Sequence, residues 1–319
     1  KKIIVSEQDR GKKIFVEFDG AMSLAKVYLN GNFIGEWPYG YTSFTFELTD
    51  KIKFGSENIL SVRLENLPES SRYYTGAGLY RGVRLVILNP VHVAHWGTFV
   101  TTPVVSVDKA IVDVRTNVCV RTKQKGKIKL VTEILDQEGK KVAKAISTSH
   151  QADSIFYHQK LQMKSPHLWS VSSPYLYSVL SKVFVDGKMA DCYLTTMGIR
   201  SIDFDTNKGF LLNGQPFKLK GVCLHHDLGP IGAAVNVAAL KRQLRLLKEM
   251  GSNAIRTSHN PPSREFLQLT DSMGFVVQVE AFDEWKVAKN LNGYHLYFDE
   301  WAEKDLRAMI RRDRNHPSV

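Results

Sequence analysis

The chain has 319 residues, of which 43% are hydrophobic and 24% charged, as is typical of a soluble globular protein with two or three domains. No run of about 18 apolar residues is present to span a bilayer, and residues 1–5 are too few and too soon followed by polar residues for a signal peptide. We therefore expect no membrane span, and the localisation stays open because a targeting signal would precede Lys1.

The net charge of +11 raises the question of a nucleic-acid partner. Lys123, Lys125, Lys127 and Lys129 alternate through a predicted strand, which places them on one face as a solvated stripe. We therefore expect no nucleic-acid partner, and contact with an acidic glycan or a cell surface remains the alternative.

Three cysteines, Cys119, Cys192 and Cys223, are far apart and match no metal-ligand or redox spacing. We expect buried or idle thiols. A disulfide between Cys119 and Cys192 stays open, and the count does not decide the compartment.

Residues 1–91 carry short alternating runs separated by turns and are predicted to be all-β. Asn30-Gly31 between two such runs predicts a β-hairpin, because both residues tolerate the positive φ of a type I′ turn. The chain begins almost directly with a strand, so this domain looks clipped at its N-terminus. Residues 92–200 repeat the β pattern and fit a second sandwich of about 100 residues.

After residue 201 the apolar period changes from 2 to 3.6, and strands alternate with helices. Strands are predicted at 217–222, 254–257 and 275–279. The first helix follows the cap Asn236 and stops at Gly251, and the second starts at Pro261-Pro262.

A third helix, at 298–312, is predicted to bury Ala302, Leu306, Met309 and Ile310. Ser318 and Val319 would then enter a fourth strand. Three βα units would leave the edge strand of the parallel sheet without a neighbour, so we expect several more units in this architecture.

Specific motifs run through the chain. They are GVCLHHD at 221–227, NAIRTSHNPP at 253–262 and DSMGF at 271–275, with GLYR at 78–81, PHLWS at 166–170 and PYLY at 174–177 before them. This set resembles glycoside hydrolase family 2, and SRYY at 71–74 with AFDEW at 281–285 is most similar to its β-galactosidases.

The resemblance implies a multidomain β plus α/β protein. It assigns a jelly-roll β-sandwich to residues 1–91, an immunoglobulin-like β-sandwich to 92–200, and about three of the eight βα units of a TIM barrel to 201–319. The implied activity of the full-length protein is hydrolysis of terminal β-galactosides in an oligosaccharide or glycan, with retention of configuration. β-Glucuronidase, β-mannosidase and a non-catalytic carbohydrate-binding fragment are the alternatives, and homo-oligomerisation stays open.

Retaining glycosidases need an acid/base and a nucleophilic carboxylate about 5 to 5.5 Å apart. In the family pattern one is a Glu preceded by Asn after strand four, and the other is a Glu at strand seven. Neither position comes before Val319, so we expect no catalytic residue in this chain and no activity from it alone. Glu280, Asp283 and Glu284 belong to the end of strand three, where structural roles suit them better.

The resemblance also implies the sugar-binding wall at the carboxyl ends of the strands. His225 and His259 match two histidines that contact sugar hydroxyls, and Arg256 matches an arginine that supports the nucleophile. Asn260 either forms the turn before Pro261 or touches the ligand.

Arg72 stands where many relatives have an Asp, and a cation there could bind hydroxyls or an acidic group. Glu284 and Trp285 complete the expected substrate-binding set, with Trp285 as a stacking platform.

No cofactor is expected. A zinc site would need His225, His226, Asp227 and His259 to converge, and we regard this as the weaker alternative. Relatives with a magnesium site use a Glu and a His two residues further on, whereas Glu284 is followed at that spacing by Lys286, which cannot coordinate a metal.

Overall fold

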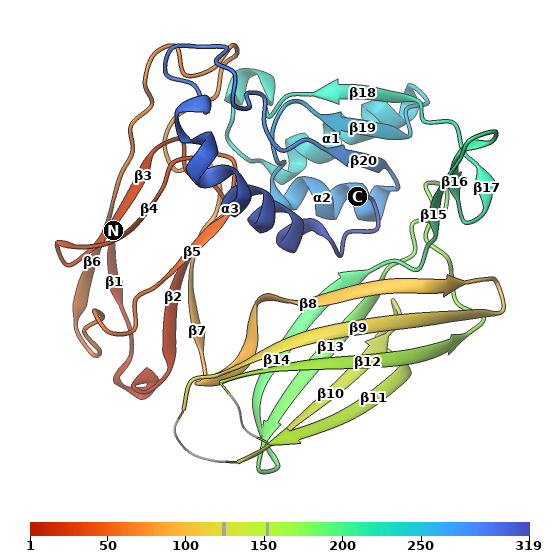
Figure 1. Ribbon diagram of the computed structural model, residues 1–319, viewed down its shortest axis with the longest axis horizontal. Coiled ribbons are helices and arrows are strands. Elements are labelled where there is room, and N and C mark those ends of the chain that lie inside the picture. Colours follow the sequence, from red (N-terminus) through yellow and green to blue (C-terminus); the bar gives the residue numbers. More distant parts are fainter. Residues whose placement is uncertain (123–125, 151–152) are drawn as a thin grey trace.

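The computed structural model describes residues 1–122, 126–150 and 153–319. Figure 1 shows a β-sandwich at the N-terminus, a second β-sandwich, and a parallel sheet flanked by helices toward the C-terminus. Helix α3 (His295–Asp313) runs between the parallel sheet and the first sandwich (Figure 1). Among the described residues, no helix combines the length and hydropathy needed to cross a membrane.

Two antiparallel sheets form the first sandwich, with strand orders β1-β6-β3-β4 and β5-β2-β7. Alternating apolar residues, such as Ile14, Val16 and Phe18, fill the core between them. Asn30 and Gly31 have φ of 53° and 81°, so the predicted hairpin between β3 and β4 is confirmed. The elements are β1 (Lys2–Ile4), a 3-10 turn (Glu7–Asp9), β2 (Lys13–Phe18), β3 (Ala25–Leu29), β4 (Asn32–Trp37), β5 (Phe44–Glu47), β6 (Glu57–Arg63) and β7 (Val83–Leu88).

The second sandwich also has two antiparallel sheets, with orders β12-β9-β8 and β11-β10-β13-β14. Trp169, just before β13, is fully buried, and its indole N–H donates to the Asp271 carbonyl at 2.9 Å, which joins this sandwich to helix α2. The strands are β8 (Val91–Val105), β9 (Lys109–Val120), β10 (Lys127–Leu135), β11 (Lys141–His150), β12 (Ser154–Lys164), β13 (Tyr177–Val185) and β14 (Lys188–Met197).

The predicted lysine stripe is described in part. Lys127 is exposed and Lys129 half-buried, and they alternate with the buried Ile128, so both lie on the face away from the core. Lys123 and Lys125 lie outside the described residues.

All three cysteines are free, so the disulfide left open between Cys119 and Cys192 is not formed. Cys119 is half-buried, whereas Cys192 and Cys223 are exposed, so of the two expected states burial does not apply to Cys192 and Cys223. Cys223 is also not idle, because Arg256 Nη1 donates to its sulfur at 3.4 Å.

The C-terminal part begins with a small antiparallel sheet and continues with three parallel strands in the order β18-β19-β20. The predicted cap Asn236 is confirmed, since its side chain accepts from the Ala239 N–H at 3.0 Å. The elements are β15 (Ile202–Asp205), β16 (Gly209–Leu212), β17 (Gln215–Pro216), β18 (Gly221–Leu224), a 3-10 turn (Gly229–Ile231), α1 (Val237–Glu249), β19 (Ala254–Thr257), α2 (Arg264–Met273), β20 (Val276–Val279) and α3.

Two predicted boundaries were wrong. The strand expected at 217–222 begins only at Gly221, because β16 and β17 turn back on each other just before it. The second helix does not start at Pro261-Pro262. Ser263 caps it instead, by accepting from the Phe266 N–H, so the two prolines lie in the loop that leads from β19.

Helix α3 differs from its prediction in two respects. It begins three residues earlier, at His295, and the expected burial is wrong for Leu306 and Ile310, which are 39% and 50% exposed. Asp305 is the residue of this helix that is buried against the first sandwich. Ser318 and Val319 form no strand, although the Val277 N–H donates to the Ser318 carbonyl at 2.6 Å.

Buried polar contacts fix the first sandwich against the parallel sheet. Arg81 is buried and donates to the carbonyls of Tyr41 and Pro261, each at 2.9 Å. The Trp37 indole N–H donates to Asp305 at 2.7 Å, and Tyr294 donates to the other oxygen of that carboxylate. Residues of the first sandwich are therefore held at the rim of the parallel sheet.

Candidate active site

Three side chains follow the three parallel strands at the edge where the strands end. His225 comes directly after β18, His259 is the second residue after β19, and Glu280 comes directly after β20. The strands pair in register, so their carboxyl ends meet at one rim. The rings of His225 and His259 lie 5.2 Å apart in an edge-to-face arrangement, so the two residues share one rim, as expected from their positions after consecutive strands.

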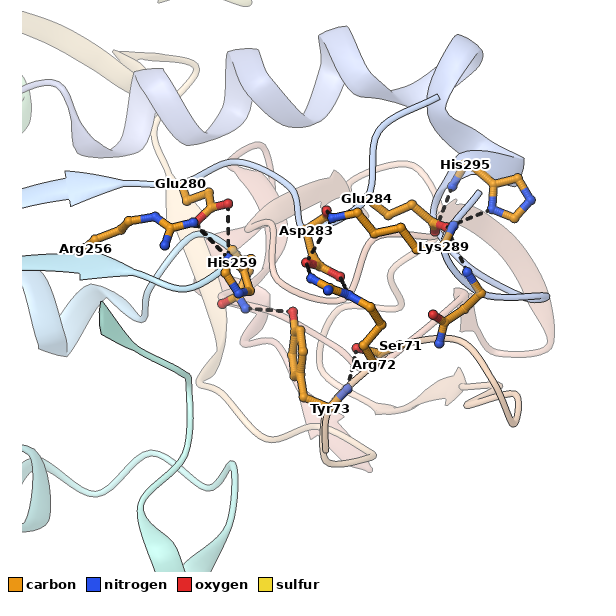
Figure 2. Close-up of polar contacts among 12 residues, drawn as sticks. Ser71, Arg72, Tyr73, Arg256, His259, Glu280, Asp283, Glu284, Lys289 and His295 are labelled. Carbon is orange, nitrogen blue, oxygen red and sulfur yellow. Dashed lines mark hydrogen bonds and ion pairs between the residues drawn. The ribbon is translucent and has the colours of Figure 1, made fainter. Parts of the chain in front are cut away.

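Arg256, His259 and Glu280 form one polar network (Figure 2). Arg256 Nη2 is 2.8 Å from the Glu280 carboxylate and 3.0 Å from His259 Nδ1, and the same ring nitrogen is 3.1 Å from Glu280. Arginine only donates and a carboxylate only accepts, so Nδ1 either accepts from Arg256 or donates to Glu280. Among the described residues Nε2 of His259 has no partner, so it is the nitrogen that can meet a ligand. The Ser258–His259 peptide bond is cis.

Tyr73 reaches this rim from the first sandwich and was not singled out as a site residue from the sequence. Its ring lies 4.6 Å from that of His225 and 6.2 Å from that of His259, and burial raises its pKa. Asn260 is buried and donates to the Tyr73 hydroxyl at 3.2 Å. Asn260 thus positions Tyr73, and the only signal for Tyr73 in the sequence was its place in the SRYY motif.

Arg72 does not face the rim as a free cation. Its guanidinium makes a two-pronged contact with Asp283, in the loop after β20, through Nε at 3.2 Å and through Nη2 (Figure 2). Lys289 also donates to Asp283. Burial works against the ionised Asp283, but its bonds with Arg72 and Lys289 prevail and lower its pKa. The pair joins the first sandwich to the loop after β20.

The structure places Glu284 inside the loop after β20 and away from the rim surface. Its side chain is buried, and its carboxylate accepts from the backbone N–H groups of Lys289, Asn290 and His295. These bonds lower the Glu284 pKa in spite of burial. Gly293 packs against the same carboxylate, where an added Cβ would overlap it. Glu284 therefore organises the loop at 284–295.

Trp285 lies at the start of this loop and is 58% exposed. Its ring meets Phe282 edge-on at 5.7 Å and lies tilted on Phe298 at 5.7 Å. One face is thus supported by other rings while the rest is open, which is the geometry of a stacking platform.

His226 and Asp227 have structural contacts. His226 is held by the Ala233 carbonyl at 2.9 Å, and desolvation lowers its pKa to about 3. Asp227 accepts from the Gly229 N–H and shapes the turn. No group of three potential metal ligands converges among the described residues, so the zinc alternative is not supported.

The carboxylates of this rim are not arranged as an acid and a nucleophile. Glu280 pairs with Arg256, Asp283 with Arg72, and Glu284 with backbone N–H groups. A general acid needs a raised pKa, whereas the pKa values of Asp283 and Glu284 are lowered. What remains at this rim is a group of polar side chains and aromatic rings that includes His225, His259 and Tyr73.

Two sandwiches followed by βα units with such a rim define the class of multidomain TIM-barrel glycosidases. Family models described as "Glycosyl hydrolases family 2" and "Glycosyl hydrolases family 2, TIM barrel domain" match residues 91–200 and 205–319. The chain belongs to glycoside hydrolase family 2 and corresponds to part of its longer members.

Two relatives and one solved structure are also similar to this chain over its full length, and each of them is longer than this chain. The β-galactosidase BoGH2A of Bacteroides ovatus is 44% identical over 322 residues, which are 100% of this chain and 38% of that protein. A β-glucuronidase of Bacteroides fragilis is 32% identical over 337 residues, 100% of this chain and 48% of that protein. A solved family 2 structure from Bacteroides cellulosilyticus superposes with a TM-score of 0.98 at 41% identity, covering 100% of this chain and 41% of the other. The chain spans less than half the length of these relatives.

Proposed function

We propose that these residues are the front part of a retaining exo-β-galactosidase whose acid/base and nucleophile glutamates follow Val319. The observation that carries the proposal is the wall formed by His225, His259 and Tyr73, which offers polar groups and rings to a sugar without offering a catalytic carboxylate pair. Similarity to the Bacteroides ovatus β-galactosidase supports the choice of sugar.

In this proposal the two histidines bind hydroxyl groups of the terminal sugar, and His259 does so through Nε2. These contacts strengthen as the ring distorts toward the transition state. Arg256 positions His259 and supports the nucleophile, and Trp285 stacks on the sugar ring or on the next residue of the glycan. Asn260 acts through Tyr73, and Glu284 acts by holding its loop.

The paired state of Arg72 favours a galactoside over a glucuronide. A uronate carboxylate would be recognised by an arginine free to bind it, whereas Arg72 is already held by Asp283. β-Glucuronidase activity is the second candidate, because the Bacteroides fragilis relative is named for it. β-Mannosidase activity and sugar binding without hydrolysis have no separate support.

A panel of p-nitrophenyl β-galactoside, β-glucuronide and β-mannoside tests the proposal on the full-length protein. The β-galactoside should have the highest kcat/KM, and residues 1–319 expressed alone should hydrolyse none of the three. A higher kcat/KM for the glucuronide would replace the proposal by its second candidate. Turnover by residues 1–319 would show that the catalytic groups lie within them.

A further inference from the structure

A large cavity lies where the two sandwiches meet helices α2 and α3. Its volume is about 700 Å³, and it is lined by residues of all three parts of the chain, among them Phe15, Trp96 and Arg264. None of the rim residues lines it. Ligand sites commonly have volumes of about 300–1,000 Å³ and often lie at domain interfaces, so this cavity has the size and place of a second site.

A strained bulge in β8 supplies two rings to this cavity. The register between β8 and β9 breaks between Val93 and Thr98, and within the break Trp96 has a φ of 48°, which is uncommon for a residue other than glycine. Arg314 donates to the Trp96 carbonyl at 2.9 Å and fixes the bulge. The rings of His95 and Trp96 lie 4.0 Å apart and both line the cavity.

The carboxylates that line the cavity already have partners. Arg84 binds two of them, Lys13 binds a third, and His316 with Ser318 binds the fourth. Arg84 and Lys13 balance two of these four negative charges, because Ser318 is neutral and His316 is charged only when protonated. The four are Glu17, Asp19, Glu47 and Asp271.

Three of the lining arginines differ in this respect. Arg121, Arg264 and Arg311 are exposed, and within the described part of the chain their guanidinium groups make no hydrogen bond or ion pair. The fourth, Arg312, is paired with Asp313. These three positive charges outnumber the two carboxylate charges that Arg84 and Lys13 leave unbalanced, so the cavity has a positive excess. The excess is carried by the side chain best suited to bind carboxylate or sulfate groups in two-pronged fashion.

We propose that this cavity is a second binding site, separate from the rim, and that it holds an acidic oligosaccharide through Arg121, Arg264 and Arg311. The His95–Trp96 pair provides the aromatic face on which a sugar ring packs, which a small inorganic anion would not need. The site does not depend on the proposed hydrolytic function, because none of its residues belongs to the rim.

Isothermal titration calorimetry on the full-length protein tests the site. The probes are a chondroitin disaccharide with only its uronate carboxylate, the same disaccharide with a 4-O-sulfate, and cellobiose as the neutral control. One molecule of acidic disaccharide should bind per chain, and comparison of the two acidic probes shows which group the arginines prefer. Cellobiose should bind at least tenfold more weakly.

Substitutions distinguish binding in the cavity from binding at the rim. Arg121→Ala and Arg264→Ala should each weaken binding about tenfold, and the double variant about a hundredfold. Arg121→Lys combined with Arg264→Lys keeps the charge and should retain part of the binding, which guards against misfolding as the cause. Arg307→Ala, which removes an arginine paired with Glu303 on α3, should leave binding unchanged.

His259→Ala should also leave acidic-disaccharide binding unchanged. The proposal is overturned if neither acidic probe binds at millimolar concentration, if cellobiose binds equally well, or if the double alanine variant binds like the wild type. It is also overturned if His259→Ala removes the binding, because the probe would then occupy the rim.

Discussion

The first sandwich meets the βα part of the chain at two places with different physical character. At the rim, the side chain of Arg72 is 49% exposed and pairs with Asp283. Below it, Asp305 is buried and holds Trp37 and Tyr294 beside a cluster of aromatic rings that includes Tyr39 and Phe282. Exposed ion pairs contribute little stability, whereas buried rings contribute much. The buried contact therefore keeps the domains together, and the rim contact sets the geometry around the ligand.

The largest effect on stability should come from Phe282→Ala. Phe282 is 3% exposed, stacks on Tyr294 at 5.0 Å and meets Tyr39 at 5.4 Å. Its truncation should lower the free energy of unfolding by about 4 kcal/mol in urea titrations. Trp285→Ala, in the same loop but exposed, is the control and should cost less than about 1 kcal/mol. Equal losses from both would contradict the contrast between the two contacts.

The buried contact should also depend on pH. Burial raises the pKa of Asp305 from 3.8 to about 6. Between these values the folded state binds the proton that the unfolded state has released, so the free energy of unfolding falls as pH rises from about 4 to about 6. The fall should be about 3 kcal/mol.

Asp305→Asn removes this titration while keeping a side chain of the same shape. The difference in unfolding free energy between wild type and variant should therefore change over that pH range. If the two pH profiles run parallel, Asp305 is not the group responsible.

The stability of the protein should decrease when Gly293, in the loop after β20, is changed to Ala. A Cβ at Gly293 overlaps the Glu284 carboxylate, so the loop must shift and some of its backbone bonds to Glu284 must weaken. We expect a loss of about 2 kcal/mol in unfolding free energy. Wild-type stability with unchanged kcat/KM would show that the loop accommodates the methyl group.

The smallest effect on stability belongs to Arg72→Ala, at less than about 1 kcal/mol. A double-mutant cycle with Asp283→Asn should give a coupling energy of the same size, which decreases at high salt. Substrate preference should nevertheless shift, because the variant leaves Lys289 as the remaining cation on Asp283 at the rim. An unchanged ratio of kcat/KM values for galactoside and glucuronide would remove Arg72 from the specificity argument.

The sequence predicted those features that depend on local patterns or on family motifs. The Asn30-Gly31 hairpin and the Asn236 cap follow from residue type and spacing. The placement of His225 and His259 at one rim follows from the family motifs and the order of the strands. Contacts between domains could not be predicted in the same way. The pairing of Arg72 with Asp283 joins residues 211 positions apart, and no period or spacing indicates it.

Because such contacts cannot be predicted from local patterns, the burial expected in α3 was partly wrong and the contacts of Glu284 were not predicted. Apolar periodicity favoured Leu306 and Ile310 as buried residues, but the face of α3 turned to the first sandwich contains the polar Asp305, which Trp37 and Tyr294 satisfy. Glu284 was grouped with the expected substrate-binding residues at the end of the third parallel strand. Only the folded loop shows that backbone N–H groups surround its carboxylate.

The central claim is that His225 and His259 bind the sugar, and the most direct test is kcat/KM for p-nitrophenyl β-galactoside in the full-length protein. His225→Ala and His259→Ala should each lower it about a hundredfold, because each removes a contact that strengthens in the transition state. His158→Ala, a histidine on the second sandwich that is paired with Asp113, should stay within about twofold of wild type. If both rim variants retain wild-type kcat/KM, this rim is not the sugar-binding wall.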